Sequence, residues 1–293
     1  AERLPDAYDA DRKTTRGLPT TAGQTDAGAC PTQELIDAYE VVDAGMTTAQ
    51  PLLNLATPYA DADRLTPNIN TAATALYNPA DPYANRDPRL KASIYYNGSK
   101  LHLERNTLLS TKPGGNCELN TNNARYTCTG YYTRKFAHYK SGRSGNLDGY
   151  FKVFRLAELY LNYAEAANEA ASTTTAPNEA VDAVNTVRAR VGMPAIPYGL
   201  SKDEFRLRLR NERRVELAFE EHRFFDVRRW KILDKTDKTV TGMRANTDGT
   251  YTRFVVDNGR KAYTDKYLLY PIPGDEAIRL QNAAGRSCQN PGW

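Results

Sequence analysis

Between about residues 152 and 171, apolar side chains recur at every third or fourth position, which is the spacing of one helix face. That face carries Phe154, Ala157, Leu161, Ala164 and Asn168. A polar break follows, and Pro177 suits the first turn of a second helix. The buried stripe of the second helix consists of Ala180, Val184, Val187 and Val191. Gly192 and Pro194 supply its ending, so the pattern predicts two helices with a short connection.

A third helix is predicted from Ser201, because Ser201 and Glu204 have the spacing of a capping box. It runs to about His222, and a further turn or two reaches Trp230. The first two helices resemble a tetratricopeptide repeat in their spacing. A single repeat cannot cover both of its faces. We therefore expect missing partners, either in trans or in an upstream part of a longer precursor.

The chain before these helices is predicted to be mostly irregular. Residues 1–30 are rich in Thr, Gly, Asp and Arg. A short helix is predicted from Thr32, and prolines punctuate residues 43–90. A β-hairpin is predicted next, with strands at 93–96 and 100–104 and a type I′ turn at Asn97-Gly98. A second strand-like run covers residues 126–139, and a Gly-rich link then leads to the helices.

The sequence thus predicts a mainly α fold. In it, a tetratricopeptide-like helix pair and further helices pack with a large irregular loop lobe that contains a short β-hairpin. We expect residues 1–149 to form the loop-rich lobe, with its short helix and small hairpins. Residues 150–233 form the helical core, and residues 234–293 form a C-terminal loop segment of the same domain.

Composition and charge argue against a disordered chain, a membrane-spanning protein and a nucleic-acid-binding protein. The 293 residues are 40% hydrophobic and include 19 Tyr and 8 Phe, which argues against simple disorder. No run approaches the roughly 18 apolar residues of a membrane helix, and no secretion signal opens the chain. A net charge of +4 is too small at this length to indicate nucleic-acid binding.

The third helix is dense in charge. Its arginines are Arg206, Arg208, Arg210, Arg213 and Arg214. Glu212, Glu216 and Glu220 recur between and after them at four-residue steps, so opposite charges lie one turn apart. This predicts a salt-bridged helix that locks onto the surrounding loops rather than a nucleic-acid patch. The aromatic residues nearby are interpreted as packing residues: Phe219, Phe224, Phe225 and Trp230.

Four cysteines allow three pairings, and the sequence does not choose among them. We favour a disulfide between Cys117 and Cys128, because an Asn-rich polar stretch separates them. Cys30 and Cys288 would then tie the two ends of the chain together. Free thiols are the alternative, whereas zinc would need close Cys or His pairs that the sequence lacks. Disulfides would indicate the periplasm, the cell surface or the exterior.

Signals of catalysis are weak. The sequence has no GxSxG, HExxH or P-loop pattern, and its histidines are isolated. Carboxylates are so plentiful that chance pairs do not indicate a glycosidase. The oxygen-rich segments 246–249 and 257–259 lack the spacing of an EF-hand and are better explained as turns. We expect no enzyme activity, no catalytic residue, no metal site and no cofactor.

Five segments, in the right order, resemble the SusD/RagB family. The family signature is similar to Glu212–Glu220, His222–Asp226 and Arg228–Trp230. The other four segments are Pro31–Glu40, Arg86–Leu90, Arg155–Ala166 and Pro271–Trp293. Together they extend across about residues 31–293. The matched segments resemble the C-terminal half of such a protein.

This resemblance implies a mostly helical, SusD-like fold and a role without catalysis. Family members are lipoproteins on the outer-membrane surface, where they cover a SusC-like TonB-dependent transporter. They capture oligosaccharide nutrients, or peptides in the RagB-like branch. The lipid anchor would lie upstream of this chain, on the extracellular face. The signature residues are structural in the family and are not transferred to a ligand site.

A sugar site needs flat aromatic faces together with amides, carboxylates or arginines. Both tryptophans lie in the segments of the resemblance, so tyrosines would have to stack on a sugar. Long, proline-stiffened loops often carry function. The candidate ligand-binding residues are therefore Tyr59, Tyr77, Asn78, Asp81, Tyr83 and Arg86. A protein-interaction scaffold or lid without a small ligand is the alternative, which burial of these tyrosines would favour.

Overall fold

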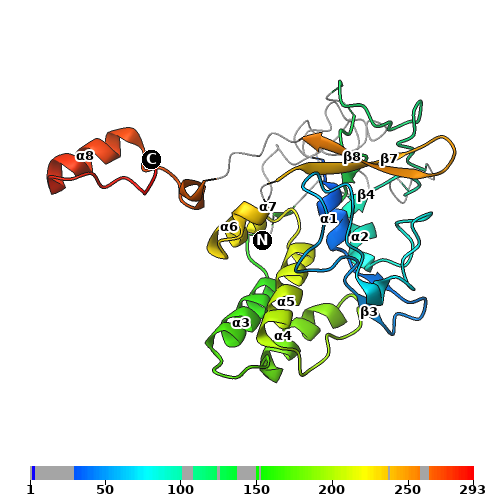
Figure 1. The fold of residues 1–293 in the computed structure, drawn as a ribbon, viewed down its shortest axis with the longest axis horizontal. Helices are drawn as coiled ribbons and strands as arrows, with labels where there is room; N and C mark the ends of the chain where they lie inside the picture. Colours follow the sequence, from blue (N-terminus) through cyan, green and yellow to red (C-terminus); the bar gives the residue numbers. More distant parts are fainter. Residues whose placement is uncertain are drawn as a thin grey trace.

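The structure is a computed structural model of the chain. It describes residues 2–3, 30–100, 108–123, 126–136, 150–151, 153–236, 238–257 and 264–293. The described residues form a mainly α fold with small antiparallel strand pairs, as the sequence predicts. Figure 1 shows a group of helices next to a lobe of loops and short strands, with a C-terminal helix that projects away from both.

The helical part is built from α3 (Leu156–Ala170), α4 (Asn178–Ala189) and α5 (Lys202–Glu216). The predicted stripes of the first two helices form much of their shared core: Leu161, Ala164, Ala180, Val184 and Val187. Phe205 and Leu209 of α5 complete this core. Phe154 is an exception, because α3 begins two residues later and the Phe154 ring is exposed. Val191 also lies beyond its helix, in a separate small cluster.

The capping box predicted at Ser201 is present at the start of α5. However, α5 ends at Glu216, and α6 (His222–Arg229) begins only after a turn that contains two left-handed residues, Phe219 and Glu221. The continuous helix predicted to His222 was therefore wrong. The ammonium of Lys135 donates to the carbonyls of Glu216 and Ala218 at 3.0 and 2.9 Å, which satisfies the end of α5 from the lobe. A short helix, α7 (Leu233–Thr236), follows.

The lobe contains α1 (Gln33–Ala38) and α2 (Pro88–Ser93). Strand β2 (Val41–Val42) pairs with β3 (Ala49–Gln50), and a 3₁₀ turn, η3, spans Thr71–Ala73. Arg86 ties α1 to the loop before α2, because its guanidinium donates to the carbonyls of Ile36, Tyr39 and Pro82 at 2.6–2.7 Å. The predicted short helix after Thr32 is confirmed.

The hairpin predicted around Asn97-Gly98 was wrong in its pairing. Strand β4 (Ile94–Tyr95) pairs instead with β5 (Tyr132–Thr133). Gly98 has the positive φ of 87° that the turn prediction required, but its amide donates to the carbonyl of Leu109 at 2.7 Å. The turn itself forms, because the Ser99 amide donates to the Tyr96 carbonyl at 3.0 Å. Buried Tyr95 and Tyr132 share a core with Leu109, and this distant contact decides which strand β4 pairs with. The end of the predicted second strand, 101–104, lies outside the described residues, as do residues 137–139.

The segment 234–293 contains regular structure that the prediction of a loop missed. Strands β7 (Val240–Ala245) and β8 (Tyr251–Asp257) form an antiparallel hairpin, which packs on α1. Asn246 and Gly249 close it as a turn, as interpreted from the sequence. The second oxygen-rich segment lies largely outside the described residues. The 3₁₀ turn η4 (Asp265–Leu268) and α8 (Gly274–Ala284) follow. Arg228 of α6 donates to the carbonyl of Tyr267 in η4 at 3.1 Å, whereas α8 projects away from the other elements in Figure 1. At the other end of the chain, β1 (Glu2–Arg3) pairs with β6 (Tyr150–Phe151).

A buried ion network joins the lobe to the helices. Arg89 of α2 contacts Glu212 and Glu216 of α5 at 2.5 and 2.9 Å. Arg188 of α4 bridges Glu212 and Glu40 at 2.9 and 2.7 Å. All five side chains are almost completely buried. The prediction of a salt-bridged third helix that locks onto the surrounding loops is confirmed.

The network continues through Glu216 and Glu220. Arg155 contacts both carboxylates, at 2.5 and 2.7 Å, and Lys135 contacts Glu220 at 2.5 Å. Burial alone would raise the pKa of Glu216, but the charges of Arg89 and Arg155 outweigh it and lower the pKa to about 2. The folded state therefore favours the ionised carboxylate.

We expect Glu216→Gln to destabilise the protein by about 3 kcal/mol, because it leaves buried arginines without their counter-charge. A depressed folded pKa adds stability that is complete above the unfolded value and is lost as the pH falls through the folded one. The melting temperature of the wild type should therefore decline between about pH 4.5 and pH 2. The variant should lack the part of this decline that Glu216 contributes. Thermal melts across this pH range measure both effects.

The matched control is Glu276→Gln on α8, which removes an ion pair to Arg279 at the exposed surface. Exposed pairs contribute little, so this change should alter stability by less than about 0.5 kcal/mol. Equal effects of the two variants would contradict the structural role assigned to the buried network.

Candidate ligand-binding site

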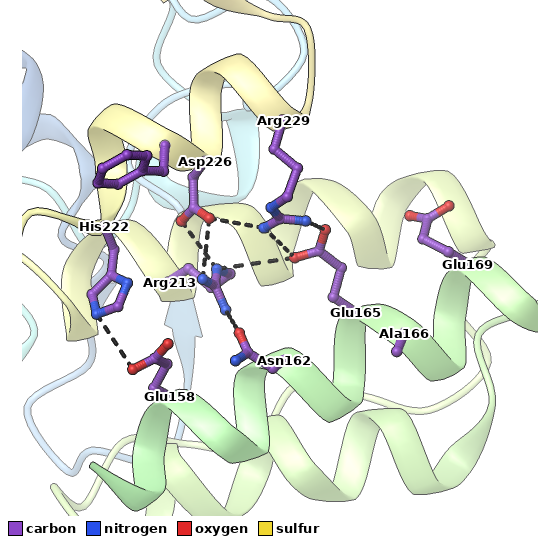
Figure 2. Close-up of a pocket in the computed structure, with 10 residues that line it drawn as sticks. Glu158, Asn162, Glu165, Ala166, Glu169, Arg213, His222, Asp226 and Arg229 are labelled. Atoms are coloured by element: carbon purple, nitrogen blue, oxygen red, sulfur yellow. Dashed lines mark hydrogen bonds and ion pairs between the residues drawn. The ribbon is translucent and has the colours of Figure 1, made fainter. Parts of the chain in front are cut away.

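An open depression lies between α3, α5 and α6, with a volume of about 540 Å³. Figure 2 shows that side chains from α3 and α6 point into it from opposite sides. Helix α3 supplies Glu158, Asn162, Glu165 and Glu169, and α6 supplies His222, Phe225, Asp226 and Arg229. Arg213 of α5 lies at the base. We call this depression the α3–α6 groove.

Ion pairs hold the floor of the groove in place. Arg213 binds Asp226 through two hydrogen bonds of 3.1 Å each, and it also donates to the Asn162 amide oxygen at 2.6 Å. One buried guanidinium thus connects all three helices. Glu165 is held by Arg229 and by the indole N–H of Trp230, the latter at 2.7 Å. Each of these floor groups already has a partner within the protein.

The rim offers groups that are better placed to meet a ligand. His222 Nε2 lies 3.4 Å from Glu158 Oε2, and both side chains are partly exposed. The ring of Phe225 is 62% exposed, and Phe224 meets it edge to face at 5.2 Å between centroids. At the other end, hydrogen bonds from Arg206 lower the pKa of Glu169 and keep it ionised. A flat ring beside carboxylate, amide and imidazole groups suits a ligand with one apolar face and several hydroxyls.

The structure places two of the six candidate residues from the sequence inside the lobe. Tyr83 is only 5% exposed, stacks on Tyr96 at 4.2 Å and donates its hydroxyl to Tyr131 at 3.3 Å. Burial raises its pKa well above the ordinary value. Arg86 is also buried, on the backbone carbonyls described above. Tyr83 and Arg86 therefore stabilise the lobe from within and are not exposed to solvent.

The other four candidates lie nearer the surface. Tyr59 and Tyr77 are partly buried on one cluster around Leu52 and Leu53. The Tyr59 hydroxyl donates to Asp37 at 2.9 Å, and Arg253 lies over its ring at 5.6 Å to the centroid. Asn78 and Asp81 are exposed. The structure thus packs Tyr59 and Tyr77 on one hydrophobic cluster and leaves Asn78 and Asp81 exposed to solvent.

Sequence reasoning missed the α3–α6 groove. Phe225 was interpreted as a packing residue, although most of its ring is exposed. The available signal was on α3, where the groove residues recur at helical spacing: Glu158, Asn162, Glu165 and Glu169. A polar stripe beside a buried stripe is usual for a surface helix, so this signal alone does not indicate a site.

No group of three or more His, Cys, Asp or Glu side chains that could hold a metal ion occurs among the described residues. No helix within the described part of the chain is long and apolar enough to cross a membrane.

The fold and the groove together define a helical scaffold with an irregular lobe and an open polar surface. The sequence model of the SusD family matches residues 4–293. The chain therefore belongs to the SusD family.

Individual relatives agree with this assignment. SusD-like protein P2 of Formosa agariphila is 36% identical over 146 residues, which are 47% of this chain and 25% of that protein. A crystal structure of a SusD-like protein from Bacteroides fragilis is 29% identical, with a TM-score of 0.74 over 100% of this chain and 53% of its own. A SusD-like carbohydrate binding protein from the same species shares the fold at 21% identity, with a TM-score of 0.66 over 94% and 52% of the two chains. The chain thus spans about half the length of the solved relatives.

We expect Tyr83→Ala to destabilise the protein by about 3–5 kcal/mol, because it empties a buried, stacked ring position. The measurement is the urea midpoint of unfolding. Tyr198→Ala is the control, since Tyr198 is 57% exposed, and it should shift stability by less than about 0.5 kcal/mol. An unchanged midpoint for Tyr83→Ala would contradict the burial of this ring.

Proposed function

We propose that the protein captures oligosaccharides and delivers them, without cleavage, to a SusC-like TonB-dependent transporter. The observation that carries this proposal is the exposed Phe225 ring at the rim of a groove that also presents Glu158, Asn162 and His222. Membership of the SusD family supports the same function. So does the carbohydrate-binding relative that shares the fold.

The physical argument concerns the two faces of a pyranose. Its C–H face packs favourably on an aromatic ring, while its hydroxyls need hydrogen-bond partners in place of water. Phe225 supplies the ring, and the carboxylate of Glu158 accepts from hydroxyls. The His222 imidazole both donates and accepts, and the amide nitrogen of Asn162, whose oxygen already accepts from Arg213, donates. A groove open along its length would admit a chain of sugars rather than a single one.

We place the protein at the extracellular face of the outer membrane, held there by a lipid anchor upstream of this chain. A surface location puts the groove in contact with nutrient oligosaccharides. It also places the protein next to the barrel that would import them. The family resemblance of the sequence supports this location.

Two specific observations favour other roles, one as a peptide-binding protein and one as a protein-interaction scaffold. The carboxylates along α3 would also suit a basic peptide, as in the RagB-like branch. Outside the groove, α3 exposes Leu156, Leu159 and Tyr163, each more than half exposed. Such a patch favours contact with another protein. That contact is compatible with the role of a lid on the transporter.

The test is a screen of polysaccharides and mixed peptides by affinity electrophoresis and calorimetry, on this chain and on its longer precursor. We expect saturable binding of one glycan class, with no release of reducing ends. Phe225→Ala should weaken it about tenfold, as expected for loss of about 1–1.5 kcal/mol of stacking. Tyr198→Ala, an exposed aromatic outside the groove, is the control and should bind normally.

A second pair of variants tests the loop surface predicted from the sequence. Asn78→Ala and Asp81→Asn change the exposed members of that set and leave the buried tyrosines intact. If these variants lose affinity while Phe225→Ala does not, the ligand lies on the lobe and the groove assignment is wrong. Binding of peptides but of no glycan would contradict oligosaccharide capture.

A further inference from the structure

Two cysteines lie against each other in the lobe, and they are not the pair that the sequence favoured. The thiols of Cys30 and Cys128 share a hydrogen bond. Cys30 lies three residues before the start of α1, and its side chain packs on the core of Tyr95, Leu109 and Tyr132. Residues 31–127 separate the two cysteines in the chain. Their contact is therefore a product of the tertiary fold.

The loop that carries Cys128 is held rigidly. The hydroxyl of the fully buried Thr127 accepts from the amides of Thr129, Gly130 and Tyr131 at 3.0–3.1 Å. The Thr127 amide in turn donates to the hydroxyl of Tyr132 at 3.1 Å. Because the backbone on either side of Cys128 is fixed in this way, its side chain stays directed at Cys30.

The other cysteines are less suitable partners. Cys117 belongs to the same small core but is completely buried, which shields it from a dissolved oxidant. Cys288 follows α8, in the segment that projects away from the lobe in Figure 1. Cys30 and Cys128 are both only partly buried. Cys30 and Cys128 therefore contact each other and are also accessible to a dissolved oxidant.

We propose that Cys30 and Cys128 form a disulfide by exchange with a small-molecule disulfide, such as glutathione disulfide, when the protein enters an oxidising compartment. The cross-link would join the start of α1 to the loop before β5. It would close a loop of almost one hundred residues and restrict the unfolded chain accordingly.

The chemistry follows from the thiol pair. The hydrogen bond from Cys128 lowers the pKa of Cys30 to about 6, so Cys30 is the nucleophile at neutral pH. Its thiolate attacks one sulfur of the oxidant and expels the other as a thiolate. Cys128 then gives up its proton and attacks Cys30 Sγ, which releases the second small thiol. One disulfide is reduced to two thiols and one protein disulfide forms.

The sequence makes the test unambiguous, because trypsin places each cysteine in a different peptide. The Lys112–Pro113 bond resists cleavage, so the four peptides are 17–64, 106–125, 126–134 and 287–293. The folded protein is equilibrated with glutathione disulfide, alkylated and digested without reduction. We expect one linked species, 17–64 joined to 126–134, with the other two cysteines alkylated. A link between 106–125 and 126–134, or alkylation of all four cysteines, would overturn the proposal.

Variants add a second readout. Cys30→Ser and Cys128→Ser should each abolish the cross-link, whereas Cys288→Ser is the matched control and should retain it. We expect the oxidised wild type to melt roughly 5–10 °C above its reduced form. Neither Cys30→Ser nor Cys128→Ser should respond to the oxidant in this way. A stabilisation by oxidant that persists in Cys128→Ser would assign the effect to another pair.

Discussion

The constraint on which the rest of the structure depends is the neutralisation of α5's buried charge. Glu212 and Glu216 lie within the protein, where an unpaired carboxylate would be strongly unfavourable. Their partners come from opposite sides, with Arg89 in the lobe and Arg155 and Arg188 on or beside the other helices. The helical side pairs Glu212 with Arg188 and Glu216 with Arg155, and Arg89 of the lobe pairs with both. Arg89 thus joins the lobe to the buried charge of α5 and favours this arrangement of lobe and helices.

That arrangement also positions the candidate site. Lys135 and Arg155 both donate to the carbonyl of Glu216, the last residue of α5. Lys135 also donates to the carbonyl of Ala218 in the turn that redirects the chain into α6. Arg213, one residue further along α5 from Glu212, then fixes Asp226 of α6 and Asn162 of α3. The groove is thus the outer side of the same charged framework. Its floor is held by ion pairs and hydrogen bonds, and its rim keeps an exposed ring and partly exposed polar groups for a ligand.

The tyrosine-rich lobe has a different physical role from the one its composition suggests. Tyr83, Tyr96 and Tyr131 form a stacked and hydrogen-bonded core, because tyrosine combines a large apolar ring with a hydroxyl that needs a partner. A lobe with little regular secondary structure requires such residues to bury area and satisfy polar groups at once. The exposed aromatic surface lies instead on α6 and the segment before α8, where Phe224 stacks on Tyr270 at 5.8 Å.

The sequence by itself determined what depends on neighbours within one or two helical turns. It specified the helix pair, the capping box at Ser201, the interleaved charges of α5 and the segments that mark the family. The tertiary structure alone decided the pairing of β4 with β5, the packing of the β7–β8 hairpin on α1, the contact of Cys30 with Cys128 and the burial of Tyr83. Each of these joins residues far apart in the chain. Their energies depend on which surfaces meet, and no local pattern contains that information.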